Sequence, residues 1–167
     1  MTSPIDENDR AAMPSFQTKR PVPYGPQAML DLVADVDKYP QFLPLCESIT
    51  VDSREQAGTC TVLIATMGVG FKSIRERFTT RVTLEPAELR VQVHNLDGMF
   101  HHLENRWEFY ARDEGALVEF SIAYSFRSPI HTFLVGGFVD KAFRRYIAAF
   151  EERAQEVYGS ARIANSE

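Results

Sequence analysis

Alternating apolar and polar positions fill the middle of the chain. Leu63, Ala65 and Met67 share one parity, and the segments 103–109 and 118–126 repeat the pattern. Side chains two positions apart in a strand lie on one face, so this period predicts antiparallel strands with one buried and one solvated face. We expect a first strand at 15–20, and further strands around 49–51, 59–69, 71–84, 89–93, 103–109 and 118–126.

A helical period appears just after the first predicted strand. Apolar residues at 29, 32, 33 and 36 predict a helix that opens at the turn 24–26 and runs to about residue 36. Asp37 is then expected to cap a second, short helix. Pro44 should end it, because a proline cannot continue the helical hydrogen bonding.

The chain closes with a longer helical pattern, predicted to run from Ser128 to Gly159. Ser128 would be its cap, Pro129 its first residue and Gly159 its last, since a helix often stops at a glycine that accepts positive φ. The apolar positions recur at spacings of three and four, at Val139, Phe143, Ile147, Phe150, Ala154 and Val157.

This order of elements predicts an α+β fold of the helix-grip type. A curved antiparallel sheet of about seven strands would wrap around the long C-terminal helix, with two short helices after the first strand. A helix laid across a concave sheet leaves room between the two. We expect one domain at 15–158, with disordered tails at 1–14 and 159–167.

Composition supports a single soluble domain. The 167 residues are 44% hydrophobic and 25% charged, and they include 12 Phe and 6 Tyr, which can line a wide apolar space. The net charge of −5 argues against nucleic acid, including DNA, as the main partner. The acidic N-terminus does not resemble a signal peptide, and the apolar run 62–71 is too short to span a bilayer. We expect a cytoplasmic protein whose membrane contact is at most peripheral, at the inner face.

No motif for catalysis, metal or cofactor binding stands out. Cys46 and Cys60 lack metal or redox spacing, and we expect no disulfide between them. His101 and His102 are adjacent and should point to opposite faces of a strand, while His94 lies on another element. Phosphate loops, dinucleotide fingerprints and nucleophile elbows are missing from the sequence.

Glu76 shares the inward parity of Ile74 and Phe78. One interpretation is that a bulge or a salt bridge accommodates it. The other is a polar group placed inside an apolar pocket, where it helps to bind a ligand. Three further polar residues share the inward parity and could hydrogen-bond a ligand head group: Thr80, Asn105 and Tyr124.

Two apolar segments are candidates for the entrance of such a pocket. The stretch 129–138 is almost uncharged and contains Gly136-Gly137, and the loop at 98–100 carries Met99 and Phe100. We expect Phe133 to Phe138 and this loop to form the entrance and to touch membranes transiently.

Several separated segments resemble the coenzyme Q-binding family, which belongs to the START-like, polyketide-cyclase-related superfamily. They are VADVDKYPQFLPLC (33–46), IRERFTTRVTL (74–84), LDGMFHHLENRWEF (96–109) and FVDKAFRRYIAAFEERA (138–154). The resemblance covers about 15–158. The chain departs from the family pattern at Leu30, where a tyrosine is expected, and at Leu45, where a tryptophan is common.

The resemblance implies a deep apolar cavity that holds a prenylated quinone or similar lipid, without catalysis and without a bound cofactor. The protein would be a lipid chaperone in quinone biosynthesis and respiratory electron transport. One alternative is a toxin-like protein that acts on a ribosomal subunit, because some bacterial relatives resemble such toxins. The other is a cyclase or dehydratase that uses Glu76 or Tyr124 as acid or base. The expected ligand-binding residues are Met67, Glu76, Phe78, Thr80, Val91, Asn105, Trp107, Phe120, Tyr124, Phe133 and Phe138.

Overall fold

The computed structural model describes residues 13–129 and 139–165. Its strands form one seven-stranded sheet in the order β1-β7-β6-β5-β4-β3-β2, with every neighbouring pair antiparallel. The elements along the chain are β1 (Ser15–Val22), α2 (Pro26–Ala34), η1 (Val36–Gln41), β2 (Cys46–Ala57), β3 (Cys60–Phe71), β4 (Ile74–Glu85), η2 (Pro86–Glu88), β5 (Arg90–Gly98), β6 (Phe100–Arg112), β7 (Gly115–Phe126) and α4 (Val139–Asn165).

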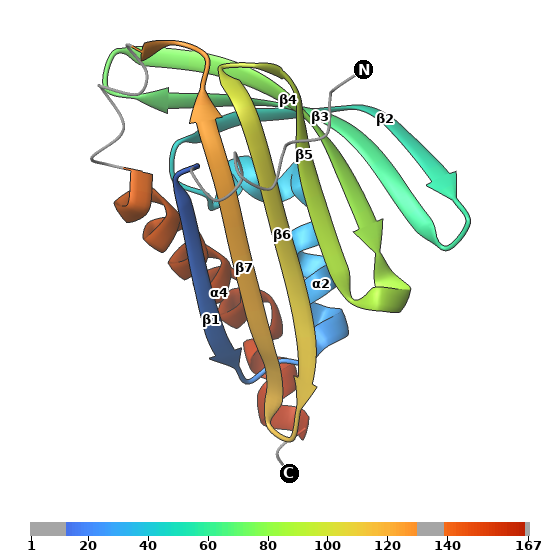
Figure 1. The fold of residues 1–167 in the computed structure, drawn as a ribbon. Coiled ribbons are helices and arrows are strands. Elements are labelled where there is room, and N and C mark those ends of the chain that lie inside the picture. The colour runs from blue at the N-terminus through green and yellow to red at the C-terminus, as the bar shows by residue number, and fades with distance from the viewer. Residues whose placement is uncertain (1–12, 130–138, 166–167) are drawn as a thin grey trace.

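The predicted α+β helix-grip architecture is confirmed. The sheet is strongly curved, and α2 and α4 lie on the same, concave side of it (Figure 1). Strands β2 to β7 follow one another as a meander, and β1 joins the far edge by pairing with β7. The helices thus close the sheet into a half-barrel with an interior between sheet and helix.

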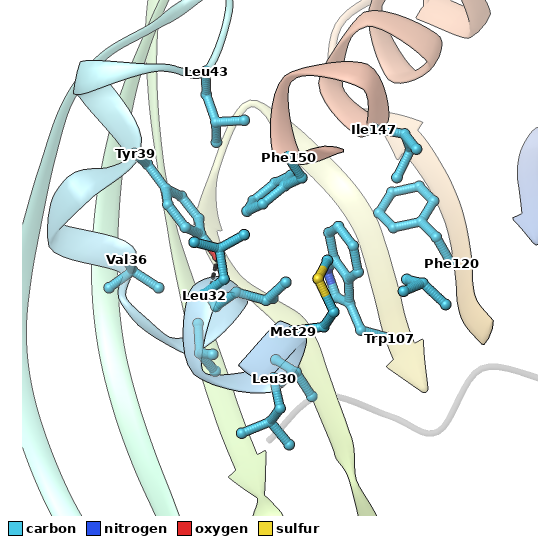
Figure 2. Packing of buried hydrophobic residues seen from close by; sticks show 14 of the residues in the cluster. Met29, Leu30, Leu32, Val36, Tyr39, Leu43, Trp107, Phe120, Ile147 and Phe150 are labelled. Atoms are coloured by element: carbon cyan, nitrogen blue, oxygen red, sulfur yellow. Dashed lines mark hydrogen bonds between the residues drawn. The ribbon is translucent and has the colours of Figure 1, made fainter. Parts of the chain in front are cut away.

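Aromatic rings join α4 to the rest of the core. Phe150 packs edge-to-face against Trp107 of β6 at a centroid distance of 4.9 Å, and against Tyr39 of η1 at 5.4 Å. Figure 2 shows these rings converging with Leu32 and Met29 of α2 nearby. The Tyr39 hydroxyl donates a hydrogen bond to the Val33 carbonyl, which ties η1 to the end of α2.

The helix boundaries differ from the prediction in two places. The second helix is a 3-10 helix that begins at Val36, and Asp37 lies inside its first turn instead of capping it. The reason is its tight i to i+3 bonding, with Lys38 N–H donating to the Asp35 carbonyl at 3.1 Å. Helix α4 continues through Gly159 to Asn165, because Gly159 does not adopt positive φ. The predicted helix start and Gly136-Gly137 fall on residues outside the described ranges.

Strands β5 and β6 separate near the turn that joins them, and we call this the divided end of the sheet. The β5–β6 ladder stops at the pair His94–Glu104, although β5 continues to Gly98 beside β4 and β6 begins at Phe100 beside β7. The Asn95 side chain crosses the gap, with Nδ2 donating to the Phe100 carbonyl at 3.1 Å.

A β-bulge flanks this division on each side, at Thr79/Thr80 in the β4–β5 pair and at Phe100/His102 in the β6–β7 pair. The second bulge makes the prediction for the two histidines wrong. It breaks the alternation of side chains, so the rings of His101 and His102 lie side by side with centroids 4.3 Å apart.

Candidate ligand cavity

A cavity of about 230 Å³ lies between the concave sheet face and α4. Residues of β2 to β7, η1 and α4 line it, and most of them are aliphatic or aromatic. The inward parity of the strands places them there. Along β4, for example, Ile74, Glu76, Phe78, Thr80 and Val82 all face the cavity.

Almost all of the predicted site residues come together in this cavity. The two exceptions, Phe133 and Phe138, lie outside the described residues, and contact with a ligand stays a prediction for the whole set. The predicted residues that line the cavity are Met67, Glu76, Phe78, Thr80, Val91, Asn105, Trp107, Phe120 and Tyr124.

Glu76 faces the cavity from a regular part of the sheet. Strands β3 and β4 pair without a register shift along their whole length, and Glu76 lies opposite Val69. The bulge interpretation of Glu76 is therefore wrong. Among the described residues that line the cavity, Glu76 is the only Asp, Glu, Lys, Arg or His.

Asn105 is engaged in the sheet. Its Nδ2 donates to the Ser121 carbonyl of β7 at 2.9 Å, and its Oδ1 accepts from the Trp107 indole N–H at 3.1 Å. The amide therefore fixes the orientation of Trp107 and joins β6 to β7. Because both polar atoms of the amide already have partners, Asn105 has less hydrogen-bonding capacity left for a ligand head group.

Thr80 and Tyr124 present hydroxyl groups to the cavity. Thr80 is 6% exposed and Tyr124 7% exposed, and neither side chain hydrogen-bonds to another described residue. Neither hydroxyl oxygen is among the fully buried atoms that lack a partner, so each keeps access to space, and the cavity is the space it faces. Burial, followed by the nearby Asp140 carboxylate, raises the pKa of Tyr124, so its hydroxyl stays protonated and can donate.

Tyr146 is a cavity residue that the sequence analysis missed. It lies on α4 one residue before Ile147 of the predicted apolar face, and it also has no hydrogen bond to a described residue. Burial raises the pKa of Tyr146 well above its usual range. The sequence could have indicated Tyr146, because the packed face of a helix spans more than one residue per turn and Tyr146 lies beside the predicted apolar positions.

The Cys46 thiol also lines the cavity. The residue is 7% exposed, and its Sγ lies 3.7 Å from the Ser48 carbonyl. Burial raises the pKa of Cys46 from 9.0 to about 11, against a smaller lowering by the Ser48 backbone. The thiol is therefore a protonated, weakly nucleophilic group at neutral pH. Cys46 and Cys60 are both free.

Aromatic rings form one wall of the cavity near the divided end of the sheet. Phe100 stacks on Phe126 at 5.1 Å and meets the edge of Phe78 at 5.1 Å. Phe100 is only 9% exposed, so its predicted role as an exposed membrane contact is wrong. The bulge beside it turns the ring inward. Leu45, which lines the cavity and is 36% exposed, is a more accessible apolar residue of the rim.

Two further features bear on the chemistry of the described residues. No group of three or more His, Cys, Asp or Glu side chains among them is placed to hold a metal ion. No helix in the described part of the chain is long and apolar enough to cross a membrane.

Comparisons with known proteins agree with this geometry. A family model described as "Polyketide cyclase / dehydrase and lipid transport" matches residues 22–151. A "Ribosome association toxin RatA" of Rickettsia prowazekii is 30% identical over 148 residues, covering 87% of this chain and 99% of the relative. The mitochondrial "Coenzyme Q-binding protein COQ10 homolog B" of Xenopus laevis is 31% identical over 138 residues. That match covers 80% of this chain but 54% of the relative, so the chain spans about half the length of this protein.

Solved structures contain the same fold. The solution structure of an 18 kDa protein from Caulobacter crescentus superposes with a TM-score of 0.73 at 33% identity. The superposition covers 88% of this chain and 99% of the Caulobacter protein, so the match extends over nearly all of both chains.

Proposed function

The chain belongs to the polyketide cyclase / dehydrase and lipid transport family, and within it we propose that the protein binds a prenylated quinone as a lipid carrier. The observation that carries the proposal is the cavity, whose described lining is almost wholly apolar and aromatic with a few polar groups. This composition is typical of sites for hydrophobic small molecules. A relative named as a coenzyme Q-binding protein supports the choice of ligand.

The size of the cavity sets how a prenylated quinone would bind. About 230 Å³ is less than the roughly 300–1,000 Å³ of most sites for drug-sized ligands. The head group and the first isoprenoid units would fill it, and a long tail would leave through the rim. Each methylene moved from water to an apolar wall contributes about 0.8 kcal/mol, so even a short buried tail supports binding.

Two tyrosines and one cysteine of the lining favour binding over catalysis by these groups. General acid–base catalysis needs a group whose pKa lies near the working pH, within reach of a reacting atom. Burial moves the pKa values of Tyr124 and Tyr146 upward, away from neutrality, and raises that of Cys46 to about 11. These side chains are hydrogen-bond donors at neutral pH and poor acids or bases.

Titration with a short-tailed benzoquinone tests the proposal. Trp107, the only tryptophan of the chain, lines the cavity, so its fluorescence should be quenched saturably. A ligand that binds only the folded state also raises the unfolding temperature, by an amount that grows with its concentration. The Trp107→Phe variant, measured by thermal shift alone, controls for quenching by free quinone. No saturable quenching and no thermal shift would refute quinone binding.

The relatives named for ribosome association support a second candidate function. The Rickettsia relative aligns over 99% of its length, whereas the coenzyme Q-binding relative aligns over 54%. The second candidate is therefore binding to a ribosomal subunit through the outer surface. Cosedimentation with purified subunits tests it. Protein that carries no lipid after gentle purification and sediments with a subunit would favour this function.

A further inference from the structure

The cavity opens at the divided end of the sheet, where strands β3, β5 and β7 end and β2, β4 and β6 begin. The opposite end is filled by buried side chains that do not line the cavity, among them Leu84, Phe109 and Val118. Towards the divided end the lining is less buried, and Leu45, at 36%, is its most exposed residue. We call this opening the cavity mouth, and the half-buried residues around it are Pro44, Phe71, Ile74, Met99 and Phe126.

Helix α4 begins at the same end and runs towards the β6–β7 turn (Figure 1). Near its start, Phe143 packs against Phe16 at a centroid distance of 5.8 Å and against Tyr124 at 5.7 Å. Further along the helix, Tyr158 packs against Tyr24 at 5.9 Å. Since Phe16 and Tyr124 lie in the halves of β1 and β7 nearer the divided end, the first turns of α4 flank the cavity mouth.

The described segments around the mouth are basic, although the chain as a whole has a net charge of −5. These segments together contain seven Lys and Arg but four Asp and Glu, and they are 44–48, 70–77, 97–102, 126–129 and 139–145. The two turns at the opposite end, 85–88 and 112–114, contain one Arg and four Asp and Glu. Positive charge therefore gathers at the end where the cavity opens.

Three of these basic side chains are available to a partner. Lys141 and Arg145 are exposed one turn apart on α4, and neither forms an ion pair with another described residue. The Lys72 ammonium group lies 5.3 Å from the centre of the Phe71 ring, so it stands beside the lining of the mouth. Arg145 lies about 9 Å along the axis from the start of α4. Because the Debye length is about 10 Å at 0.1 M salt, both α4 charges can act on a surface at the mouth.

An apolar centre surrounded by basic groups is complementary to an anionic lipid bilayer. Each Lys or Arg near such a bilayer strengthens binding by about 1 kcal/mol, which is about fivefold in affinity. The most exposed residue of the mouth, Leu45, is aliphatic. An aliphatic side chain suits the acyl boundary of a bilayer better than it suits RNA bases, which stack on aromatic rings.

We propose that the cavity mouth docks on an anionic lipid bilayer, with Leu45 in the acyl boundary and Lys72, Lys141 and Arg145 at the lipid phosphates. This inference rests on the proposed carrier function, because a lipid carrier has to exchange its ligand with a membrane. It identifies the surface through which the ligand would pass, and this surface differs from the expected contact at Phe100, which is buried.

Cosedimentation with vesicles tests the docking. The vesicles consist of phosphatidylcholine alone or of phosphatidylcholine with about one third phosphatidylglycerol, and no quinone is added. At about 0.1 M salt the wild-type protein should bind the anionic vesicles about a hundredfold more tightly, as three basic residues predict. At about 1 M salt, where the Debye length is about 3 Å, this preference should be almost lost.

Charge variants identify the surface. Lys141→Gln combined with Arg145→Gln should weaken binding to the anionic vesicles about 25-fold, and adding Lys72→Gln should weaken it about fivefold further. Arg81→Gln combined with Arg112→Gln is the matched control, because it lowers the net charge equally at two exposed positions away from the mouth. The control should change binding less than about twofold, since its charges lie beyond a Debye length from the bilayer. Fluorescence quenching by a short-tailed benzoquinone should be unchanged in every variant, which shows that the cavity is intact.

The outcomes separate this inference from the proposed function. Benzoquinone binding together with equal binding to both kinds of vesicle, or with equal losses in the α4 and control variants, would overturn the inference and leave the carrier function standing. Docking that depends on Lys141 and Arg145, with no benzoquinone binding, would support the inference and refute the quinone. Protein that sediments with ribosomal subunits through the same two residues, and not with anionic vesicles, would overturn membrane docking and assign the basic surface to RNA.

Discussion

The Cys46 thiol should report on whether the cavity is occupied. It lines the cavity, it is 7% exposed, and burial raises its pKa to about 11. The thiolate is the species that reacts with alkylating reagents. A variant with Cys60→Ser leaves Cys46 as the only thiol, because the chain has two cysteines.

The expected rate follows from the shift in pKa. At pH 8 a thiol of pKa 11 is about 0.1% ionised, whereas one at the ordinary value of 9.0 is about 9% ionised. Ionisation alone should therefore slow alkylation of Cys46 about 100-fold relative to the unfolded chain at pH 8. The rate should rise about tenfold for each pH unit from pH 7 until the pH approaches 11.

The raised pKa also makes stability depend on pH. A thiol with a higher pKa in the folded state stabilises that state below the unfolded value of 9.0, and this contribution is lost as the pH rises through about 11. Cys46→Ser should remove this part of the alkaline loss of stability.

Iodoacetamide labelling followed by mass spectrometry measures the reaction of Cys46. The folded Cys60→Ser variant is compared with the same variant in denaturant, and Cys46→Ser, which keeps the partly exposed Cys60, is the control. A short-tailed benzoquinone is first reduced to its hydroquinone, which does not react with thiols. An excess of this hydroquinone should slow the labelling of Cys46 further and leave the labelling rate of Cys60 unchanged. Folded and denatured Cys46 reacting at equal rates at pH 8 would refute the reasoning.

Three further changes test the backbone of the chain and the hydrogen-bonded amide in the cavity wall. Gly98→Ala should destabilise by about 2 kcal/mol or more, because Gly98 has a φ of +116° and an added Cβ would lie 2.5 Å from the Arg77 carbonyl oxygen. Gly159→Ala should instead stabilise α4 by up to about 1 kcal/mol, and a loss of stability in urea unfolding would contradict the helical Gly159. Asn105→Ala should cost about 1–3 kcal/mol, since it leaves the Trp107 indole N–H unpaired. Gln27→Ala, at an exposed hydrogen bond to Asp31, is its control, and equal thermal stability of the two variants would argue against this role of the amide.

The sequence predicted the inward face of the sheet well, because strand parity is a local property. Once β3 and β4 pair in register, Met67, Phe78 and Thr80 must face one side. The same argument placed Glu76 in the cavity, although an acidic side chain is uncommon there. Periodicity therefore carried more information about the site than residue type did.

The features that the sequence did not reveal depend on contacts between distant segments. The bulge beside Phe100 lies where β6 still pairs with β7 but no longer with β5, and it turns an apolar side chain from the predicted surface into the interior. Asn105 looked like a ligand group, but its amide is engaged by Ser121 of the neighbouring strand. Gly159 looked like a helix stop, yet a glycine ends a helix only where the chain takes positive φ.

The volume of the cavity bears on the choice between a lipid carrier and a surface-only interaction protein. Unfilled space in a core lowers stability by about 24 cal/mol per Å³. A cavity of about 230 Å³ therefore lowers the stability of the protein without ligand by roughly 5 kcal/mol. That amount is comparable with the total stability of many small domains, about 5–15 kcal/mol. A protein whose function lay wholly on its outer face would gain from larger side chains at positions such as Ala65, which lines this space. A bound lipid would recover the same free energy, and the protein would then be most stable when it carries its ligand.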